Sequence, residues 1–176
     1  MRDEAERQAD SRAVEVGARR CRDAEGVSDR TLRGVIAALA LAGAGIAAYL
    51  VYARYTATQL ACTTGGCETV QHSKYAKAAG IPVAVLGLAA YLAVFVTALS
   101  ARVEAAAIGA AIVLAGLAFG VYLIVIQVAV IDAICQWCLA SDAILALLAI
   151  ASAERLRRAA GRPQAQSGTA PMVERG

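Results

Sequence analysis

Four long stretches of the chain carry almost no charge, and they set the first expectation for its architecture. No Asp, Glu, Lys or Arg occurs within residues 34–53, 81–100 or 106–131, and Asp142 is the only charged residue within 133–153. A bilayer core of about 30 Å is spanned by about 20 helical residues. These stretches are apolar on every side, unlike the amphipathic helices of a soluble bundle. We therefore predict an all-α membrane protein, a four-transmembrane-helix bundle with helices at about 34–53, 81–100, 106–130 and 133–153.

The overall composition agrees with this interpretation. Of the 176 residues, 59% are hydrophobic and only 18% are charged, which is too apolar for an ordinary soluble domain of this size. The formal net charge is only +3 and comes mostly from basic residues beside the predicted helices. It gives no reason to expect a nucleic-acid partner.

The Lys and Arg residues near the helix ends predict the orientation of the bundle, because cytoplasmic loops retain an excess of them. One side of a four-helix topology holds only Arg54, Lys74 and Lys77. We therefore predict that both termini are cytoplasmic and that the loops 54–80 and 131–134 lie outside. The basic residues that flank the helices on the cytoplasmic side are Arg30, Arg33, Arg102, Arg155, Arg157, Arg158 and Arg162.

Polar segments flank the predicted membrane domain, residues 31–156. Residues 1–30 are rich in Arg, Asp, Glu and Ala and show no wide apolar stripe, so we expect a disordered or weakly helical cytoplasmic arm without an assigned function. Residues 157–176 include Gly, Pro, Gln and Ser and are expected to form a cytoplasmic tail.

The long outer loop contains two cysteines, Cys62 and Cys67, separated by four residues. Gly65 and Gly66 lie between them and permit the tight turn that would bring the two sulfurs together. The stretch that follows Cys67 could form a short helix that caps the bundle. Taken alone, this pair is compatible with a purely structural disulfide.

A second pair, Cys135 and Cys138, forms a C-x-x-C motif at the outer end of the fourth predicted helix. Residues three apart on a helix share one face, so these two can form a small, easily reduced disulfide. The helix N-terminus also favours a thiolate at Cys135. A bridge within one turn closes too short a loop to add much stability, so this pair indicates thiol exchange.

A metal site is the alternative interpretation of the outer cysteines. Four thiolates, with or without His72, would satisfy tetrahedral zinc, but the outer face is oxidising and the motif enters the membrane. We expect no metal, and we interpret His72 as a polar loop residue. Cys21 lies in the cytoplasmic arm, where thiols stay reduced, and is expected to be incidental.

Asp142 lies four residues after Cys138 and seven after Cys135, which places it on the same helical face and about 10 Å deeper than Cys135. An ionisable group at that depth is costly and is a functional candidate, here for proton delivery to a reduced quinone. A neutral carboxyl that is hydrogen-bonded to a neighbouring helix is the structural alternative. The sequence leaves both open.

These motifs in combination resemble the vitamin K epoxide reductase family, and in particular its bacterial branch. The resemblance covers about residues 30–155, and the combined spacing is far more specific than a single C-x-x-C. The residues that carry it are Cys62, Cys67, Ser73, Gly80-Ile81-Pro82, Gly87 and Cys135-Gln136-Trp137-Cys138.

The resemblance implies a path for electrons. The dithiol of a thioredoxin-fold partner would attack the loop disulfide at Cys62, and the freed Cys67 would attack Cys135. Cys138 would then be released as the thiolate that contacts a quinone held in the bundle. Ser73 matches a loop serine of the family that is expected near the reactive end of the quinone. Cys138, Ser73 and Asp142 are the expected quinone-proximal residues.

The sequence also departs from the family's pattern. Animal members hydrogen-bond the quinone through an asparagine, but this chain has no Asn, and the region reads Val83-Ala84-Val85. Asp142 stands where animal members carry a tyrosine. Many bacterial members append a thioredoxin-like domain that does not follow here, so we expect a separate partner.

We therefore expect a quinone-dependent thiol oxidoreductase in the bacterial plasma membrane. It would reoxidise a DsbA-like thioredoxin-fold partner on the extracytoplasmic side and reduce a membrane quinone of the menaquinone, ubiquinone or vitamin K type as its substrate. Two alternatives remain open. One is a vitamin K quinone or epoxide reductase that runs on a thiol donor, and the other is a metal-binding membrane protein without turnover.

Overall fold

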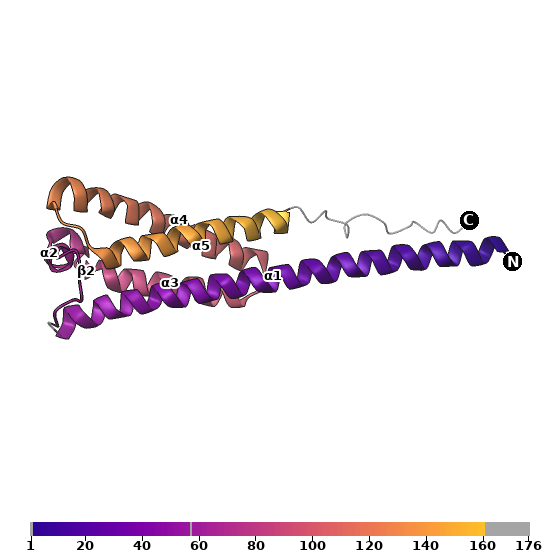
Figure 1. Ribbon diagram of the computed structural model, residues 1–176, viewed down its shortest axis with the longest axis horizontal. Coiled ribbons are helices and arrows are strands. Elements are labelled where there is room, and N and C mark those ends of the chain that lie inside the picture. Colours follow the sequence, from indigo (N-terminus) through magenta and orange to yellow (C-terminus); the bar gives the residue numbers. More distant parts are fainter. Residues whose placement is uncertain (1, 57, 161–176) are drawn as a thin grey trace, which may run out of the picture.

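The computed structural model is a long helical bundle (Figure 1). The loop between the first two bundle helices, residues 58–82, forms a small capping segment at one end. The structure describes residues 2–56 and 58–160, with side chains from residue 29 onward. The elements in chain order are α1 (Arg2–Thr56), α2 (Cys67–His72), η1 (Lys74–Ala76), β1 (Lys77–Ala78), β2 (Ile81–Pro82), α3 (Val83–Leu99), α4 (Val103–Ile126), η2 (Gln127–Ile131) and α5 (Gln136–Ala160).

Four helices form the bundle, as the charge-free stretches predicted. Three are long and apolar enough to cross a membrane: Asp29–Thr56, which is the second half of α1, the combined span Val103–Ile131, and Gln136–Ala160. The fourth, α3, is a shorter apolar helix of 17 residues. The prediction of an all-α four-helix membrane bundle is confirmed.

Small side chains let the helices approach closely. α1 and α4 each pack against both α3 and α5, so the four helices surround a common centre. On α1, Ala40, Ala44 and Ala47 are buried in the core, together with Leu148 of α5. A Cβ added at Gly43 would overlap the Tyr91 ring of α3, which shows how closely these two helices pack.

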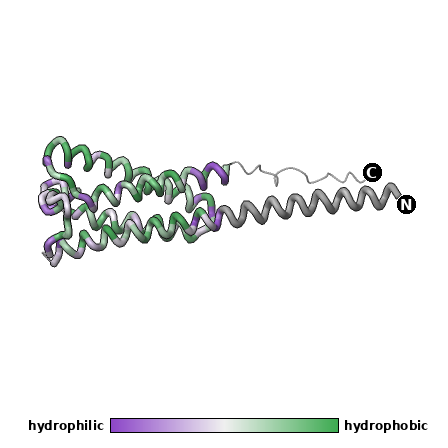
Figure 2. Tube along the Cα trace, viewed as in Figure 1, coloured by the Kyte–Doolittle hydropathy of each residue, from purple (hydrophilic) through white to green (hydrophobic). Residues whose placement is uncertain are grey.

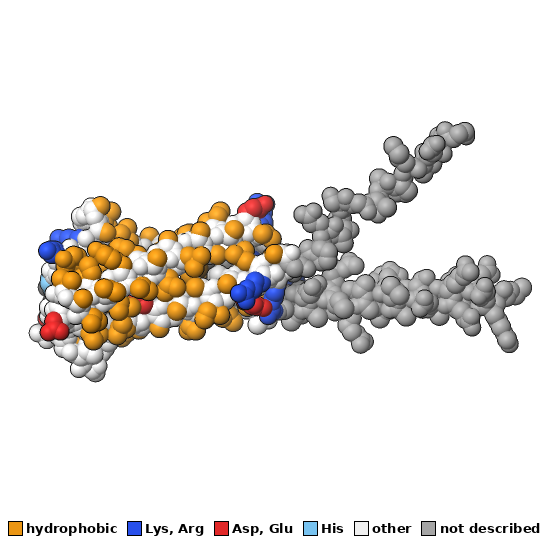
Figure 3. Space-filling model, turned by 90° about the horizontal axis from the view of Figure 1, so that it is seen from above, with side chains coloured by type: hydrophobic (Ala, Val, Ile, Leu, Met, Phe, Trp, Pro, Cys, Tyr) orange, Lys and Arg blue, Asp and Glu red, His pale blue; other side chains and the backbone are white. Residues whose placement is uncertain are grey.

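Large hydrophobic side chains cover the outside of the bundle. The apolar residues dominate the length of the helices, and the polar ones gather toward the two ends (Figure 2). Figure 3 shows the same division on the surface, with Lys, Arg, Asp and Glu side chains mostly at the ends of the described part. Leu41, Leu92, Ile108, Leu114 and Ile150 are examples of exposed apolar side chains, each more than 45% exposed. Such a surface suits a lipid environment.

The loop between α1 and α3 contains more regular structure than its sequence predicted. The expected short helix after Cys67 is present as α2, and η1 follows it. β1 and β2 then pair antiparallel as a two-residue ribbon, with Lys77 opposite Pro82. Since Pro82 belongs to this ribbon, α3 begins at Val83, two residues later than the expected helix.

The segments outside the membrane domain are only partly described. α1 begins at Arg2, so the predicted arm, residues 1–30, is continuous with the first membrane helix (Figure 1). Side chains before residue 29, including that of Cys21, and residues 161–176 of the predicted tail lie outside the described residues. The interpretations of the arm, the tail and Cys21 stay predictions.

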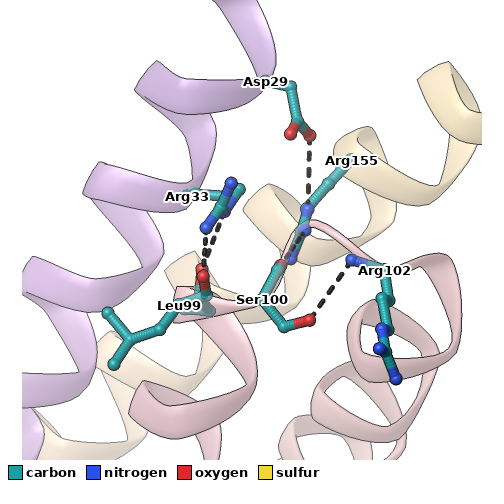
Figure 4. A network of polar contacts seen from close by, with 7 residues as sticks. Asp29, Arg33, Leu99, Ser100, Arg102 and Arg155 are labelled. Atoms are coloured by element: carbon teal, nitrogen blue, oxygen red, sulfur yellow. Dashed lines mark hydrogen bonds and ion pairs between the residues drawn. The ribbon is translucent and has the colours of Figure 1, made fainter.

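A polar network closes the end of the bundle opposite the capping segment (Figure 4). Arg155 of α5 is 5% exposed, pairs with Asp29 of α1 at 3.4 Å and donates to the Ser100 carbonyl at 2.8 Å. Arg33 of α1 donates to the Leu99 carbonyl at the end of α3. Guanidinium groups are favourable at a helix C-terminus, where carbonyls lack helical partners. These contacts join α1, α3 and α5.

We expect Arg155→Met to destabilise the detergent-solubilised protein by about 1–3 kcal/mol, because it removes a charged, partly buried hydrogen bond to the Ser100 carbonyl and leaves Asp29 without this partner. The measurement is the unfolding midpoint followed by circular dichroism. Arg157→Met is the matched control, since that side chain is exposed on the same helix. Equal midpoints for Arg155→Met and the wild type would contradict the prediction.

Candidate active site

The capping segment contains a disulfide between Cys62 and Cys67, whose Cα atoms are 6.1 Å apart. Gly65 has a positive φ of 71°, which glycine adopts without strain and which turns the chain back toward Cys67. Gly66 lies so close to the Ile134 backbone that a Cβ there would meet its carbonyl oxygen at 2.7 Å. The turn is therefore packed directly against the segment that precedes α5.

The second cysteine pair is reduced in the structure and lies where α5 begins. Cys135 immediately precedes the first residue of α5 and has no exposed surface, whereas Cys138 in the first turn is partly buried. The Cys138 N–H lies 3.3 Å from the Cys135 sulfur and donates to it. The two cysteines thus lie side by side on one turn, at the N-terminus of the helix.

Cys62, Cys67, Cys135 and Cys138 meet in one cluster. Cys67 and Cys135, both with no exposed surface, pack together with Val70, and Cys62 and Cys138 are partly buried against them. The loop pair and the helical pair are therefore neighbours, although about 70 residues separate them in the chain. Thiol–disulfide exchange requires such proximity because it passes through a mixed disulfide.

The two residues inside the C-x-x-C motif hold the loop in this place. Gln136 accepts hydrogen bonds from the Thr63 N–H, at 3.0 Å, and from its hydroxyl, at 2.5 Å. Its Nε2 donates to the Ala61 carbonyl at 3.2 Å, and Trp137 Nε1 donates to the same oxygen at 2.8 Å. Tyr49 contacts the Trp137 ring edge-on at a centroid distance of 5.1 Å. The loop around Cys62 is therefore held by hydrogen bonds to Gln136 and Trp137 of the C-x-x-C motif.

Gln127 was not singled out in the sequence, although it is the only amide in the apolar stretch 106–131. It is the first residue of η2, a π-helical turn, and its side chain is 3% exposed. Its Oε1 accepts the Cys135 N–H at 2.8 Å. A polar residue inside an apolar run was the available signal, and its partner, a backbone N–H eight residues later, could not be deduced from the sequence.

A cavity of about 240 Å³ lies between the four helices beneath the capping segment. Its walls are mostly apolar, with contributions from all four bundle helices. The expected quinone-proximal residues Ser73, Cys138 and Asp142 all line it, as do Gln71 and Gln127. Among the four outer cysteines, Cys138 is the one that reaches the cavity.

The polar groups of the cavity wall are held by specific contacts. Ser73 Oγ donates to the Val70 carbonyl at 2.8 Å. Gln71 Nε2 lies 3.9 Å from the Cys138 sulfur, and the Gln71 carbonyl accepts from Arg54 of α1. α2 is therefore tied to α1 on one side and faces Cys138 on the other.

Asp142 faces the cavity from α5, two helical turns below Cys135. A Cβ added at Gly120 of α4 would overlap its carboxylate, so the absence of a side chain at Gly120 makes room for it. The neighbouring Ser141 bonds to the Tyr91 hydroxyl of α3 through both its carbonyl and its own hydroxyl, at 2.9 and 2.8 Å. The prediction that Asp142 faces the bundle interior agrees with this placement.

The contacts around Cys135 favour its ionised form. The hydrogen bond from the Cys138 thiol is the largest effect and lowers the pKa of Cys135 to about 7, against the opposing effect of burial. The backbone N–H groups of Cys138 and Trp137 and the Gln71 amide act in the same direction. Cys135 is therefore the more acidic thiol of the reduced pair, as its position at a helix N-terminus predicted.

The described part of the chain shows no group of side chains that would fit the zinc alternative. Within residues 29–56 and 58–160, no three His, Cys, Asp or Glu side chains are arranged to hold a metal ion. His72 is exposed and does not line the cavity.

We expect the Cys135 thiolate, followed by its ultraviolet absorbance in a Cys21→Ser background, to appear with a midpoint near pH 7. Below that pH the thiolate is lost. In Cys138→Ala the largest cause of the lowered pKa is absent, so the midpoint should rise toward the ordinary value of about 8.5. Cys135→Ala is the control that assigns the signal. An unchanged midpoint in Cys138→Ala would refute the stated cause.

The comparison with known families agrees with this geometry. The model of the vitamin K epoxide reductase family matches residues 34–153, which include the four bundle helices and both cysteine pairs. Its members are thiol and quinone oxidoreductases, and the apolar helices make this chain an integral membrane protein. The chain belongs to the vitamin K epoxide reductase family.

Proposed function

We propose that this protein is a quinone-dependent thiol oxidoreductase that generates disulfides in a partner protein. The observation that carries the proposal is the order of exposure along the four clustered cysteines. Cys62 is partly exposed at the outer loop, Cys67 and Cys135 are fully buried between the pairs, and Cys138 lines the cavity. This order describes a path from the protein surface to the centre of the bundle.

The first step is exchange with the partner. A thiolate of the partner's dithiol attacks Cys62, the accessible sulfur of the loop disulfide, and Cys67 leaves as a thiolate. The second partner thiol then displaces Cys62, so the partner becomes oxidised and the loop pair becomes a dithiol. Two electrons have moved to the loop pair, and the partner leaves with a new disulfide.

The second step moves the electrons to the helical pair. Starting from an oxidised Cys135–Cys138 pair, Cys67 attacks Cys135, with which it shares the buried cluster, and Cys138 is released. Closure of the Cys62–Cys67 disulfide then frees Cys135. The product has a loop disulfide and a helical dithiol, which is the arrangement present in the structure. It is the state poised to reduce the quinone.

The third step occurs at the cavity. The dithiol of Cys135 and Cys138 becomes a disulfide, and the quinone takes up its two electrons and two protons to become a hydroquinone. The apolar walls and few polar groups of the cavity are typical of a small-molecule site. Ser73 and Asp142 reach the same cavity, and we assign Asp142 to proton delivery during this step.

The partner that we propose is a separate DsbA-like thioredoxin-fold oxidase on the extracytoplasmic face of a bacterial plasma membrane. The flanking basic residues support this orientation, with both termini cytoplasmic. Thr63, Thr64 and Gly65 beside Cys62 are exposed and uncharged, which leaves the disulfide open to approach. The quinone is of the menaquinone, ubiquinone or vitamin K type.

Quinone reduction by the purified protein, with a reduced thioredoxin-fold oxidase as donor, tests the order of the cysteines. Cys135→Ala and Cys138→Ala should abolish turnover. Cys62→Ala should block the protein donor but keep partial turnover with a small dithiol, because the cavity-side pair is intact. Cys21→Ala should be silent. Equal losses from Cys62→Ala and Cys138→Ala with the small dithiol would refute the assigned order.

Asp142→Asn tests proton delivery. If Asp142 supplies a proton, this variant should slow quinone reduction by about 100-fold or more, the range of general acid catalysis. Exchange between the two cysteine pairs, followed by trapping of their redox states, should keep its rate. A variant that reduces quinone at the wild-type rate would assign Asp142 a structural role only.

A further inference from the structure

Gln127 is a buried residue in the cavity wall, and its contact with Cys135 uses only one end of its side-chain amide. Its side chain is 3% exposed and lines the cavity between the four helices. It lies in η2, and π-helical turns occur frequently at functional sites. The Gln127 carbonyl is also fixed, since it accepts the Ala133 N–H at 3.1 Å.

The contact with Cys135 determines which way the Gln127 amide points. The Cys135 backbone N–H can only donate, and it lies 2.8 Å from the Gln127 side chain. The atom that faces it must therefore be the oxygen, Oε1, because the other end of the amide carries only donors. Nε2, with its two N–H groups, points away from Cys135.

Nε2 is left with no acceptor among the side chains and backbone of residues 29–56 and 58–160. In the same part of the chain, however, no fully enclosed side-chain nitrogen or oxygen lacks a hydrogen-bond partner. Nε2 must therefore retain some accessible surface. For an almost fully buried side chain that lines the cavity, that surface opens to the cavity.

Several other polar groups of the wall already have partners within the protein. Ser73 Oγ donates to the Val70 carbonyl, and Gln71 Nε2 faces the Cys138 sulfur. An amide donor that is buried and unpaired costs free energy unless a ligand satisfies it. Gln127 thus offers the cavity a donor that its own protein does not use.

We propose that Gln127 Nε2 donates a hydrogen bond to a carbonyl oxygen of the bound quinone. This inference rests on the proposed quinone-reducing function and names a ligand contact within it. Gln127 is hydrogen-bonded to Cys135, Cys138 lies on the same turn as Cys135, and both Gln127 and Cys138 line the cavity, so the donor and the cavity-facing sulfur lie at the same end of it. A donor there strengthens as charge develops on the carbonyl oxygen during reduction.

The first test measures quinone binding without turnover. The chain has one tryptophan, Trp137, which lies between the two cysteines of the motif, so quenching of its fluorescence by menadione reports binding at this site. Gln127→Met keeps the approximate size of the side chain and removes the donor. Its Kd for menadione should rise about tenfold, the effect of one lost hydrogen bond. Gln59→Met, an exposed loop glutamine, is the matched control.

The second test separates the donor from the support that Oε1 gives to Cys135. In Gln127→Glu the introduced carboxyl accepts the Cys135 N–H in either protonation state, but it donates to the cavity only when protonated. Its menadione affinity, divided by that of the wild type at each pH, should therefore fall as the pH rises. Dividing by the wild-type affinity removes the pH dependence that comes from groups common to both proteins.

A wild-type affinity in Gln127→Met, or an affinity ratio for Gln127→Glu that is constant with pH, would overturn the inference. If Gln127→Met does not fold, the pH dependence of Gln127→Glu decides alone. Failure of the proposed function would look different, because the wild-type protein itself would then not reduce menadione with a thiol donor.

Discussion

The backbone groups where α4 ends and α5 begins must find hydrogen-bond partners within the protein, and the site is built from the side chains that supply them. A helix end leaves several such groups without helical partners, and lipid supplies none. Gln127 accepts the Cys135 N–H, and Thr64 donates to the Ile134 carbonyl at 2.9 Å. Each contact that satisfies this junction also positions a cysteine or the loop that carries one.

The need to satisfy backbone hydrogen-bonding groups also explains the role of Gln136 and Trp137, the two residues between Cys135 and Cys138. Gln136 and Trp137 both bond to the Ala61 carbonyl, and Gln136 also bonds to Thr63, so an irregular loop is satisfied by the first turn of α5. The loop therefore cannot move far from the motif without losing several hydrogen bonds. Proximity of the two cysteine pairs is a property of the fold and does not depend on the partner.

The sequence was sufficient for the architecture, and it singled out the four clustered cysteines and Asp142 as candidates for the chemistry. Charge-free stretches of spanning length predicted the four helices, because length and hydropathy constrain a membrane helix strongly. Spacing predicted that Cys135, Cys138 and Asp142 share one face of the fourth helix, whereas only the resemblance to a family linked this helical pair to Cys62 and Cys67. The ribbon that includes Pro82, the contact of Tyr49 with Trp137 and the role of Gln127 were not predicted. The contact of Tyr49 with Trp137 joins segments distant in the chain, whereas the ribbon and the Gln127 contact depend on irregular backbone geometry over a few residues. Hydropathy and spacing patterns encode neither.

The loop that would meet a protein partner and the cavity that would hold a quinone are built from different residues, and this separation affects how such a protein can diversify. No residue of the loop segment 58–66 lines the cavity, while the cavity wall is contributed by the bundle helices and by residues 70–76. Substitutions at exposed loop positions such as Gln59 can therefore change the surface that a thiol partner would meet without altering the cavity. The fold keeps the loop surface and the cavity apart, and the buried Cys67 and Cys135 lie between them as the link through which both would act.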